Sequence, residues 1–395
     1  MALNYRKKAL PIPRIYQLDY TTFMREYRNQ RPVIIPDIVS TWSPITKWTP
    51  QYLTNVLKLN YEDRLQVFVS KDNKHFINHP DVTQLVTMSA QEFASHVFPD
   101  DLETAVDTAD DDHTRYYLRT FSMPDVLFCD VDQQRQVDEL LTLLVSKVKD
   151  SNGRHDQNED KIPQCDGQNT DMFIEKETDM NMNIDKKTDE TRAVWEDFLS
   201  PISLSDDDDV HVSDGVQEDH DVKKKLAEEV EVQKHTDSDG EVAENDDIHM
   251  RQTMFQEMHS RIFNCKTMQL WIGTRGNITP LHYDRNHGLL AQISGRKELV
   301  LFSHEDTAFL YPHPTYSDRA HTSRINLRRI NESSYAALFS KLKEAQPYTC
   351  ILKPGELLYM PPFWWHDVTS LDNCVSVTLP WDIDGYEEVP PCMLR

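Results

Sequence analysis

Cysteine is scarce in this chain, and the cysteines that do occur are widely spaced. Six are found among the 395 residues, and no two of them form a Cys-x-x-Cys pair. This spacing argues against zinc fingers and against a disulfide framework. It favours a reducing compartment instead.

Long apolar runs are also missing. No run approaches the roughly 20 residues that cross a bilayer as a helix. The opening residues 1–14 contain basic side chains but lack the apolar core of a signal peptide. We therefore expect a protein without a membrane partner, located in the nucleus, the cytoplasm or both.

Positive charge is in deficit. Lysine and arginine number 42 against 66 acidic residues, which gives a formal net charge of −24. Surfaces that bind nucleic acid need clustered basic residues, so this balance argues against RNA as the substrate. One local basic cluster keeps RNA open as an alternative, and it consists of Arg319, Arg324, Arg328 and Arg329.

Most of the negative charge is concentrated in residues 151–250. This tract contains 30 acidic and 10 basic residues, so it carries −20 of the net −24. Its few large apolar side chains cannot bury enough surface to offset the entropy of ordering, which predicts a disordered insert. The tract is either a solvated loop or an acidic module that contacts a basic partner.

The other residues are the right number for one β-domain flanked by helices. We expect residues 1–128 to supply N-terminal helices and the first strands, and residues 129–150 to form an amphipathic helix packed on the core. Residues 251–395 contain eight short runs of strand character between turn signals: 268–273, 279–284, 289–294, 298–302, 349–352, 356–359, 365–369 and 375–379. Eight such strands predict a closed or nearly closed β-barrel that binds ligands in its mouth.

The run Thr-Pro-Leu-His-Tyr-Asp at 279–284 carries the clearest chemical signal. Side chains alternate faces along a strand, so His282 and Asp284 point the same way. Three other His-x-Asp copies lie in a turn, in the acidic tract or just past a strand. His366, which follows Pro-Pro-Phe-Trp-Trp, adds a second imidazole. Two histidines and one carboxylate form the facial triad of non-heme Fe(II) enzymes that use oxygen.

Several motifs in this order resemble a known family. The His-Tyr-Asp run, a lysine fifteen residues after its histidine, the segment PGELLYMPPFWWH and the closing SVTLPW are similar to the JmjC (cupin-like) 2-oxoglutarate oxygenases. The likeness is strong over 265–381 and weaker near the start, and it is greatest to the small protein hydroxylases of the factor-inhibiting-HIF type and to the tRNA wybutosine hydroxylase. It implies a mainly β fold with flanking helices, a double-stranded β-helix or jelly-roll cupin barrel, interrupted by the acidic insert.

The resemblance also implies cofactors and residue roles. The cofactors are Fe(II), 2-oxoglutarate as cosubstrate, and O2. His282, Asp284 and His366 match the iron ligands. The positions that match the cosubstrate site are Lys297, which would bind the distal carboxylate, the hydroxyl residues Thr279 and Tyr117, and the polar residue Thr378 on the last strand.

Two positions depart from the family pattern. Gly288 stands where relatives often carry an asparagine that helps hold the end of 2-oxoglutarate nearest the iron. Pro380 stands where they often carry tryptophan, and proline brings neither an indole nor a backbone N–H. Asn286 or His287 is a candidate replacement for the missing amide. Neither departure touches the metal ligands, which favours a working enzyme.

The hypothesis from sequence is an Fe(II)- and 2-oxoglutarate-dependent dioxygenase. It would hydroxylate an amino-acid side chain of a protein substrate and release succinate and CO2. Hydroxylation of a tRNA base and histone demethylation are the alternatives within the family. A non-catalytic cupin-like scaffold with an acidic partner-binding loop is the alternative outside it. Few residues follow the barrel, so we expect a monomer.

Overall fold

The computed structural model describes residues 8–77, 79–99, 114–120, 123–145 and 252–393. The predicted disorder of 151–250 concerns residues outside these ranges. The described strands form two sheets, one of five strands in the order β1-β10-β9-β12-β7 and one of eight in the order β2-β11-β8-β13-β6-β5-β3-β4.

The elements have the following bounds. The strands are β1 (Leu10–Pro11), β2 (Val33–Ile35), β3 (Leu65–Ser70), β4 (Thr83–Met88), β5 (Tyr116–Arg119), β6 (Gln269–Gly273), β7 (Ile278–Tyr283), β8 (His287–Ser294), β9 (Lys297–Phe302), β10 (Tyr348–Leu352), β11 (Leu357–Met360), β12 (Trp365–Ser370) and β13 (Cys374–Trp381). The α-helices are α2 (Tyr20–Glu26), α3 (Ser43–Lys47), α4 (Pro50–Asn60), α5 (Ala90–Val97), α6 (Asp125–Val131), α7 (Gln134–Leu144) and α11 (Ser333–Leu338). Short 3-10 turns occur at Val39–Thr41, His304–Phe309, Ser340–Glu344 and Pro391–Met393.

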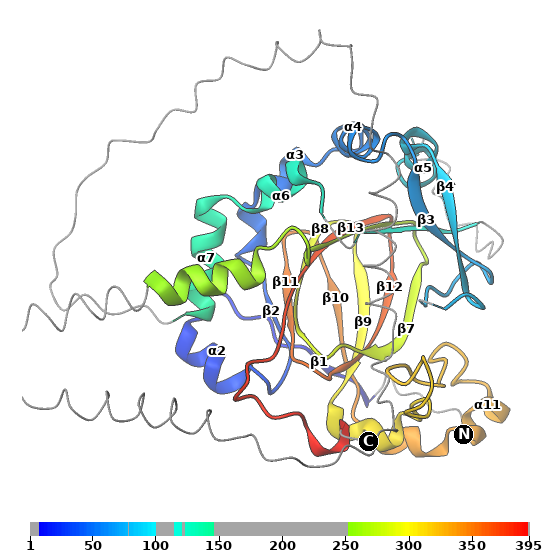
Figure 1. Cartoon of the computed structure of the whole chain (residues 1–395). Helices are drawn as coiled ribbons and strands as arrows, with labels where there is room; N and C mark the ends of the chain where they lie inside the picture. The colour runs from blue at the N-terminus through cyan, green and yellow to red at the C-terminus, as the bar shows by residue number, and fades with distance from the viewer. Residues whose placement is uncertain (1–7, 78, 100–113, 121–122, 146–251, 394–395) are drawn as a thin grey trace, which may run out of the picture. The chain divides into compact units, whose positions relative to one another are not determined.

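All eight strands predicted in the C-terminal half are present, and they form a jelly roll. Strands β7, β12, β9 and β10 make one antiparallel sheet, while β6, β13, β8 and β11 make the facing one. The two sheets face each other in the middle of Figure 1. The prediction of a cupin barrel with flanking helices is confirmed.

Alternating side chains divide each strand between the barrel interior and its outer face. On β8, Leu290 packs inside with Leu299 and Leu301 of β9. Its neighbours Leu289 and Ala291 face outward, into a core shared with the helices. This period of two is what the apolar run of β8 requires in a strand buried on both faces.

The N-terminal segment completes both sheets. Strand β2 pairs with β11, and β5 pairs with β6, so residues from before and after the acidic tract share one hydrogen-bonded sheet. Helix α2 begins where Asp19 accepts a bond from the backbone N–H of Thr22 at 3.0 Å, a standard N-cap. The structure therefore contains the helix expected near the start of the chain.

The prediction of a single amphipathic helix over 129–150 is wrong. Helix α6 ends at Val131, the backbone is extended at Gln133, and α7 runs only to Leu144. The break lets each helix turn its own apolar side chains inward, and the Asp132 carboxylate at the break meets the His259 ring at 2.8 Å. The expected packing on the core is confirmed, because Leu140 and Leu141 are buried there.

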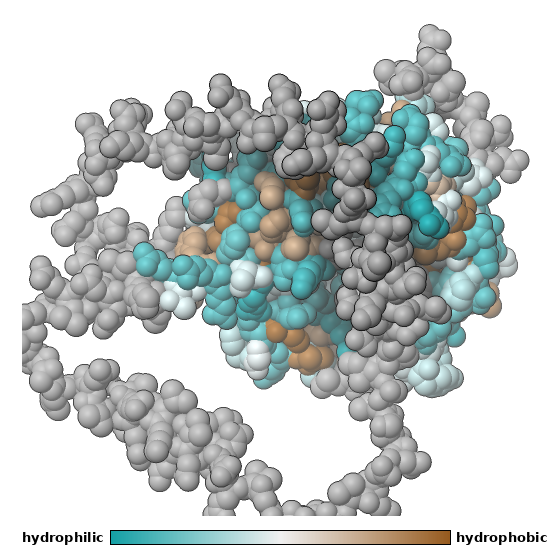
Figure 2. All heavy atoms as spheres, turned by 45° about the horizontal axis from the view of Figure 1, so that its top comes forward, coloured by the Kyte–Doolittle hydropathy of each residue, from teal (hydrophilic) through white to brown (hydrophobic). Residues whose placement is uncertain are grey.

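None of the described helices is long and apolar enough to span a bilayer. In Figure 2 the described atoms on the visible face are mostly hydrophilic, and the hydrophobic ones form separate patches.

Candidate metal and cosubstrate site

The strand β7 presents His282 toward the barrel interior. Tyr283 points to the opposite face, where its ring packs edge-on against Trp365 with ring centroids 4.8 Å apart. Strand β12 brings the second histidine, because His366 lies directly opposite His282 in the antiparallel pair. Their rings are 4.1 Å apart between centroids.

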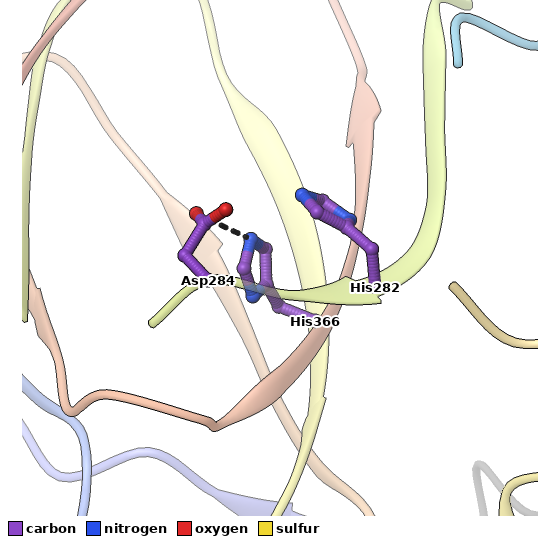
Figure 3. Close-up of side chains that lie close together, drawn as sticks. All are labelled: His282, Asp284 and His366. Carbon is purple, nitrogen blue, oxygen red and sulfur yellow. Dashed lines mark ion pairs between the residues drawn. The ribbon is translucent and has the colours of Figure 1, made fainter. Parts of the chain in front are cut away.

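The three predicted metal ligands converge in space. One potential ligand atom from each of His282, Asp284 and His366 lies within 4.8 Å of the other two. The Nε2 atom of His366 is 3.7 Å from an oxygen of Asp284, as the dashed line in Figure 3 marks. Among the described residues, no other group of three histidine, cysteine or acidic side chains is arranged this way.

Backbone carbonyl groups orient both imidazoles. Nδ1 of His282 lies 2.8 Å from the Pro280 carbonyl oxygen, and Nδ1 of His366 lies 3.0 Å from that of Trp364. A carbonyl can only accept, so each Nδ1 carries the proton and each Nε2 keeps its lone pair for a metal. This arrangement of the outer partners is typical of metal-binding histidines.

The electrostatics of the cluster also suit a cation. Burial and the neighbouring His366 lower the pKa of His282 to about 3, so its imidazole is neutral near pH 7. Partial loss of hydration raises the pKa of Asp284, but the two histidines outweigh it and hold that pKa below its usual value. Neutral imidazoles and an ionised carboxylate are the states that bind a metal. The residues therefore fit Fe(II).

Phe363 joins the two ligand-bearing segments. Its N–H donates to the Asp284 carbonyl at 2.7 Å, and its backbone adopts a positive φ of 64°. A bulky residue at positive φ is strained. The adjacent Trp365 is fully buried against Leu281 and Phe302 on the outer face of the sheet. This location makes Trp365 a packing residue of the outer core.

Lys297 lies on the same interior face as the histidines. It opens β9 opposite Ser370 of β12, and four residues further along β9 Leu301 lies opposite His366. At about 3.3 Å per residue, the two positions are separated by about 13 Å along the sheet. The lysine is only 3% exposed, and its ammonium makes no ion pair or hydrogen bond with any residue that the structure describes.

The three predicted hydroxyl residues have different surroundings. Thr279 faces Val368 across a bulge in the β7–β12 pair, on the face that carries the histidines. Tyr117 lies opposite Gly273, where an added Cβ would come within 2.6 Å of the tyrosine ring. Glycine is therefore required beside the ring. Thr378 lies opposite Leu290, and its hydroxyl accepts a bond from the Trp271 indole at 2.9 Å.

The residues considered as replacements for the missing amide have other partners. His287 is fully buried, contacts Tyr359 and Glu387 through its two nitrogens, each at 3.0 Å, and stacks on Trp381. Asn286 donates to Asp382 at 3.0 Å. Neither side chain therefore takes the place of the amide.

The Gly288 position itself is spacious. It lies opposite Pro380 and Met360 in the sheet, and a Cβ added there would first meet the Met360 methyl carbon at 3.7 Å. That separation is an ordinary van der Waals contact, so no clash prevents a larger residue.

The basic cluster considered as an RNA patch is largely neutralised. Three of its four arginines face carboxylates: Arg319 pairs with Asp81 at 3.5 Å, Arg328 with Asp367 at 2.5 Å and Arg329 with Glu332 at 2.9 Å. An arginine paired in this way offers little charge to a phosphate.

The sequence did not predict a role for Arg119, Trp271 or His321. The Arg119 guanidinium lies over the Trp271 ring, 4.7 Å from its centroid, and both residues belong to the interior face. His321 belongs to a loop that runs along β7, where its carbonyl accepts from the Tyr283 N–H at 3.1 Å. The Tyr-Tyr-Leu-Arg pattern already placed Arg119 two residues from Tyr117, on the same face of a strand. This spacing was the only feature of the sequence that indicated a position for Arg119 in the site.

Comparison with known proteins agrees with this architecture. Residues 20–384 match the Cupin-like domain family. The chain belongs to this family. Strands β2 to β13, the barrel and the triad lie inside the matched range, and the resemblance inferred from the motifs is confirmed.

Individual relatives match over shorter stretches of this cupin-like chain. Jumonji C domain-containing protein 5 of Drosophila melanogaster is 39% identical over 115 residues, which is 29% of this chain and 27% of the relative. Lysine-specific demethylase 8 of Xenopus tropicalis is 35% identical over 115 residues, 29% of this chain and 25% of the relative. The HSPB1-associated protein 1 homolog of Danio rerio is 41% identical over 132 residues, which is 32% of this chain and 28% of the relative. The chain thus spans about a quarter of the length of each of these relatives.

Proposed function

We propose that this protein is an Fe(II)- and 2-oxoglutarate-dependent oxygenase that hydroxylates an amino-acid side chain of a protein substrate. One observation carries the proposal. A buried lysine without an anionic partner among the described residues, Lys297, shares the barrel interior with a His-Asp-His cluster whose two imidazoles are oriented by backbone carbonyl groups.

An unpaired ammonium inside a barrel is costly, because burial removes hydration that only a partner charge replaces. A ligand carboxylate offsets this cost through a charge-assisted hydrogen bond. The ligand must also reach the metal ligands along the same interior face. A dicarboxylic acid with a keto group fulfils both conditions, with one end at Lys297 and the other at the triad.

His282, Asp284 and His366 would hold the iron. When bound, Fe(II) supplies oxygen activation coupled to the oxidation of 2-oxoglutarate to succinate and CO2. Thr279 and Tyr117 line the interior face and can donate hydroxyl hydrogen bonds to the cosubstrate carboxylate near Lys297. Leu299 and Leu301 separate the two ends and exclude water from the space between them.

The exposure of the ligands assigns the direction of substrate entry. The Asp284 side chain is 62% exposed, whereas that of His366 is 7% exposed. The substrate bond to be hydroxylated therefore approaches from the Asp284 side, and the cosubstrate lies deeper, toward Lys297. Hydroxylation of a carbon in a peptide side chain needs no further cofactor.

Two other substrates use the same site chemistry. Relatives named lysine-specific demethylases support an N-methyl group as an alternative target, because hydroxylation of that carbon removes the methyl group. RNA is less favoured, because three of the four clustered arginines are paired with carboxylates. A non-catalytic scaffold would neither bind iron nor form succinate.

The deciding experiment incubates the iron-loaded protein with 2-oxoglutarate, oxygen and cell extract. Mass spectrometry then searches peptides and RNA separately for products with one added oxygen atom, and succinate is measured in parallel. We expect succinate with hydroxylated peptides, and neither product with the His282→Ala variant. Succinate with demethylated peptides or oxidised RNA alone would redirect the substrate assignment. Absence of succinate would contradict the oxygenase proposal.

A further inference from the structure

Asp284 is held in place differently from the other two triad residues. His282 and His366 lie opposite each other in the hydrogen-bonded β7–β12 pair, which fixes both of them. Strand β7 ends just before Asp284 and β8 begins at His287, so the aspartate lies in the turn between the two strands. We call residues 284–286 the metal turn. The position of the Asp284 carboxylate depends on the contacts that anchor this turn.

His287 anchors the end of the metal turn where β8 begins. The side chain is fully buried. Its two ring nitrogens contact the Tyr359 hydroxyl and the Glu387 carboxylate, each at 3.0 Å. Its ring also stacks on Trp381, with the centroids 4.6 Å apart and the planes 4° apart. A buried ring with polar partners on both nitrogens and a stacked neighbour is fixed in one orientation, and it fixes the adjoining backbone.

The segment after β13 continues alongside the metal turn. Trp381 lies opposite His287 in the β13–β8 pair, so the next residue, Asp382, comes beside Asn286. The Asn286 amide donates to the Asp382 carboxylate at 3.0 Å. We use the name C-terminal clasp for three acidic residues of this segment: Asp382, Asp384 and Glu387.

Two arginines hold the C-terminal clasp. Arg28, just past α2, donates to Glu387 at 2.9 Å and also to Asp384. Arg261, from the helical residues 252–262, donates to Asp384 at 2.5 Å and to the Asp382 carbonyl at 2.9 Å. In Figure 1 the red C-terminal segment runs past α2 after it leaves the barrel. The clasp therefore connects the metal turn to segments from before and after the acidic tract.

The ionic cluster at the clasp is largely buried. The side chains of Arg28, Glu387 and Asp384 are 8%, 5% and 13% exposed. Burial of charges costs hydration, and apolar side chains of similar volume often stabilise a fold as well as a buried ion pair does. What such a cluster adds is a defined geometry, because its hydrogen bonds have preferred lengths and directions. Defined geometry is what an exposed metal ligand in a turn needs.

We propose that the C-terminal clasp positions Asp284 for metal binding. This inference rests on the proposed function, and it adds positioning residues outside the triad. The clasp fixes Asn286 and His287 at one end of the metal turn, while the Phe363 N–H fixes the Asp284 carbonyl at the other. A ligand that is already oriented loses less freedom when the metal binds. Loss of a clasp contact should therefore weaken metal binding although all three ligands remain.

The variant Arg261→Gln separates positioning from charge, because the two effects have opposite signs. Removal of a positive charge should leave the affinity for a cation unchanged or raise it. Loss of the contacts with Asp382 and Asp384 should loosen the metal turn and lower that affinity. We expect the full-length variant to bind Mn(II) about fivefold more weakly than wild type, somewhat less than the roughly tenfold or larger loss caused by removing a direct partner of a ligand.

Electron paramagnetic resonance of free Mn(II) measures this affinity. Mn(II) stands next to Fe(II) in the affinity order of the divalent metals. Arg329→Gln is the matched control, because it removes the same charge at an exposed ion pair with Glu332 outside the clasp. This control should bind Mn(II) as wild type does.

Asn286→Ala tests the clasp without any change of charge. It removes the bond to Asp382 and should weaken Mn(II) binding by about two- to threefold. Asn331→Ala, at an exposed asparagine, is its control and should have no effect. Asn286→Ala also keeps the inference testable if Arg261→Gln fails to fold.

Hydrogen exchange of the metal-free protein tests positioning independently of metal binding. The Phe363 N–H donates to the Asp284 carbonyl at 2.7 Å, so its exchange reports how firmly the metal turn is held. Peptides across this position contain few other amides, since Pro361 and Pro362 have no N–H. We expect faster exchange at this position in Arg261→Gln and in Asn286→Ala than in wild type.

Asp130→Asn controls for a general loss of stability. Like Glu387, Asp130 is a buried carboxylate with several donors, and it accepts from Lys47, Trp48 and Tyr52 at 2.6, 2.9 and 2.8 Å. These contacts join α6 to α3 and α4 and do not include the metal turn. The variant should lower the melting temperature, yet leave both Mn(II) affinity and Phe363 exchange as in wild type.

Unchanged or tighter Mn(II) binding by folded Arg261→Gln would overturn the inference. Equal weakening in Asp130→Asn would overturn it too, as would wild-type binding and exchange in Asn286→Ala. If the wild-type protein bound no Mn(II), the proposed metal site would fail, and Phe363 exchange in the metal-free variants would still decide whether the clasp holds the metal turn.

Discussion

Lys297 and His366 face the same interior of the barrel from neighbouring strands, the first opposite Ser370 and the second opposite Leu301. The relationship places a buried cation and a metal-binding imidazole on one interior face, with the apolar side chains of Leu299 and Leu301 between them. A ligand that satisfies both ends must be an anion at one end and a metal chelator at the other. This pairing supports the proposed cosubstrate more strongly than either residue alone.

The first prediction concerns the triad. His282→Ala, Asp284→Ala and His366→Ala should each reduce iron-dependent 2-oxoglutarate turnover below detection, because two remaining ligands hold Fe(II) poorly. Thermal unfolding should still be cooperative, since none of the three triad residues belongs to the apolar clusters that form the cores. Succinate formation and bound iron measure the effect. His79→Ala, in another His-x-Asp copy, is the control, and normal turnover in any triad variant would refute the assignment.

The second prediction concerns Lys297. Lys297→Ala should raise the KM for 2-oxoglutarate by roughly ten- to a hundredfold, because it removes a charge-assisted bond worth about 1.5–3 kcal/mol. Iron binding should change much less, since the lysine is about 13 Å from His366 along the sheet. Steady-state kinetics with iron titration separates the two effects, with the exposed Lys343→Ala as a matched control. An unchanged KM would mean that another group anchors the distal carboxylate.

The third prediction compares ligand-free proteins. Lys297→Met retains the apolar stem and removes the buried charge, so it should raise the melting temperature of the protein without 2-oxoglutarate. Added 2-oxoglutarate should stabilise the wild-type protein but have little effect on the variant. Thermal shift assays with and without the ligand check both statements. Equal stabilisation of the two proteins would show that Lys297 does not contact the ligand.

The strands of the barrel could be predicted because each one has a signal in its own short stretch of sequence. Eight short runs with alternating side chains and turn residues indicated the strands, and all eight are present. His282 and Asp284 followed from the period of two along one strand. The position of His366 beside His282 depends on the pairing of β7 with β12, which no local sequence pattern predicts. The assignment of His366 as a ligand therefore came from the resemblance to the family.

The features that were missed depend on contacts between distant segments. Arg119 enters the site through the β5–β6 pair, and His321 through a loop that adds to the edge of β7. The break after Val131 has no proline or glycine to announce it, and it follows from how α6 and α7 each bury their own apolar side chains. Tertiary packing decides such features, and helical spacing alone does not.

The fourth prediction concerns acid stability and the buried group around Glu387. Burial raises the Glu387 pKa, but bonds from His287, Asn29 and the Asp384 backbone outweigh it and lower that pKa to about 2. A lowered carboxylate pKa stabilises the fold above the unfolded value of about 4.3, and this contribution is lost as the pH falls toward 2. Glu387→Gln should therefore be less stable than wild type at pH 7, and the difference should shrink between about pH 5 and pH 2.

Chemical denaturation at several pH values measures this difference. Glu344→Gln, at an exposed position, is the control and should show no such trend. A constant difference between wild type and Glu387→Gln across the range would show that the ionised state of Glu387 does not contribute to folding.

The fifth prediction concerns the acidic tract. The helical residues 252–262 return the chain to the junction of α6 and α7, where His259 meets Asp132 at 2.8 Å, and α7 extends only 11 residues beyond it. The described segments on either side of the tract therefore meet through this contact, and a Gly/Ser linker can join them. Replacing 151–250 with a Gly/Ser linker should preserve the barrel, iron binding and 2-oxoglutarate turnover without substrate.

Any effect of the deletion should appear in partner binding, in substrate choice or in their salt dependence, because the tract carries −20 of the net charge. Limited proteolysis should also cleave the tract in the intact protein well before the strands around His282. Both outcomes follow from one premise, which is that the barrel buries its own core from residues on either side of the tract. A deletion variant that fails to fold, or a tract as resistant to protease as β7, would show that the tract is part of the folded domain.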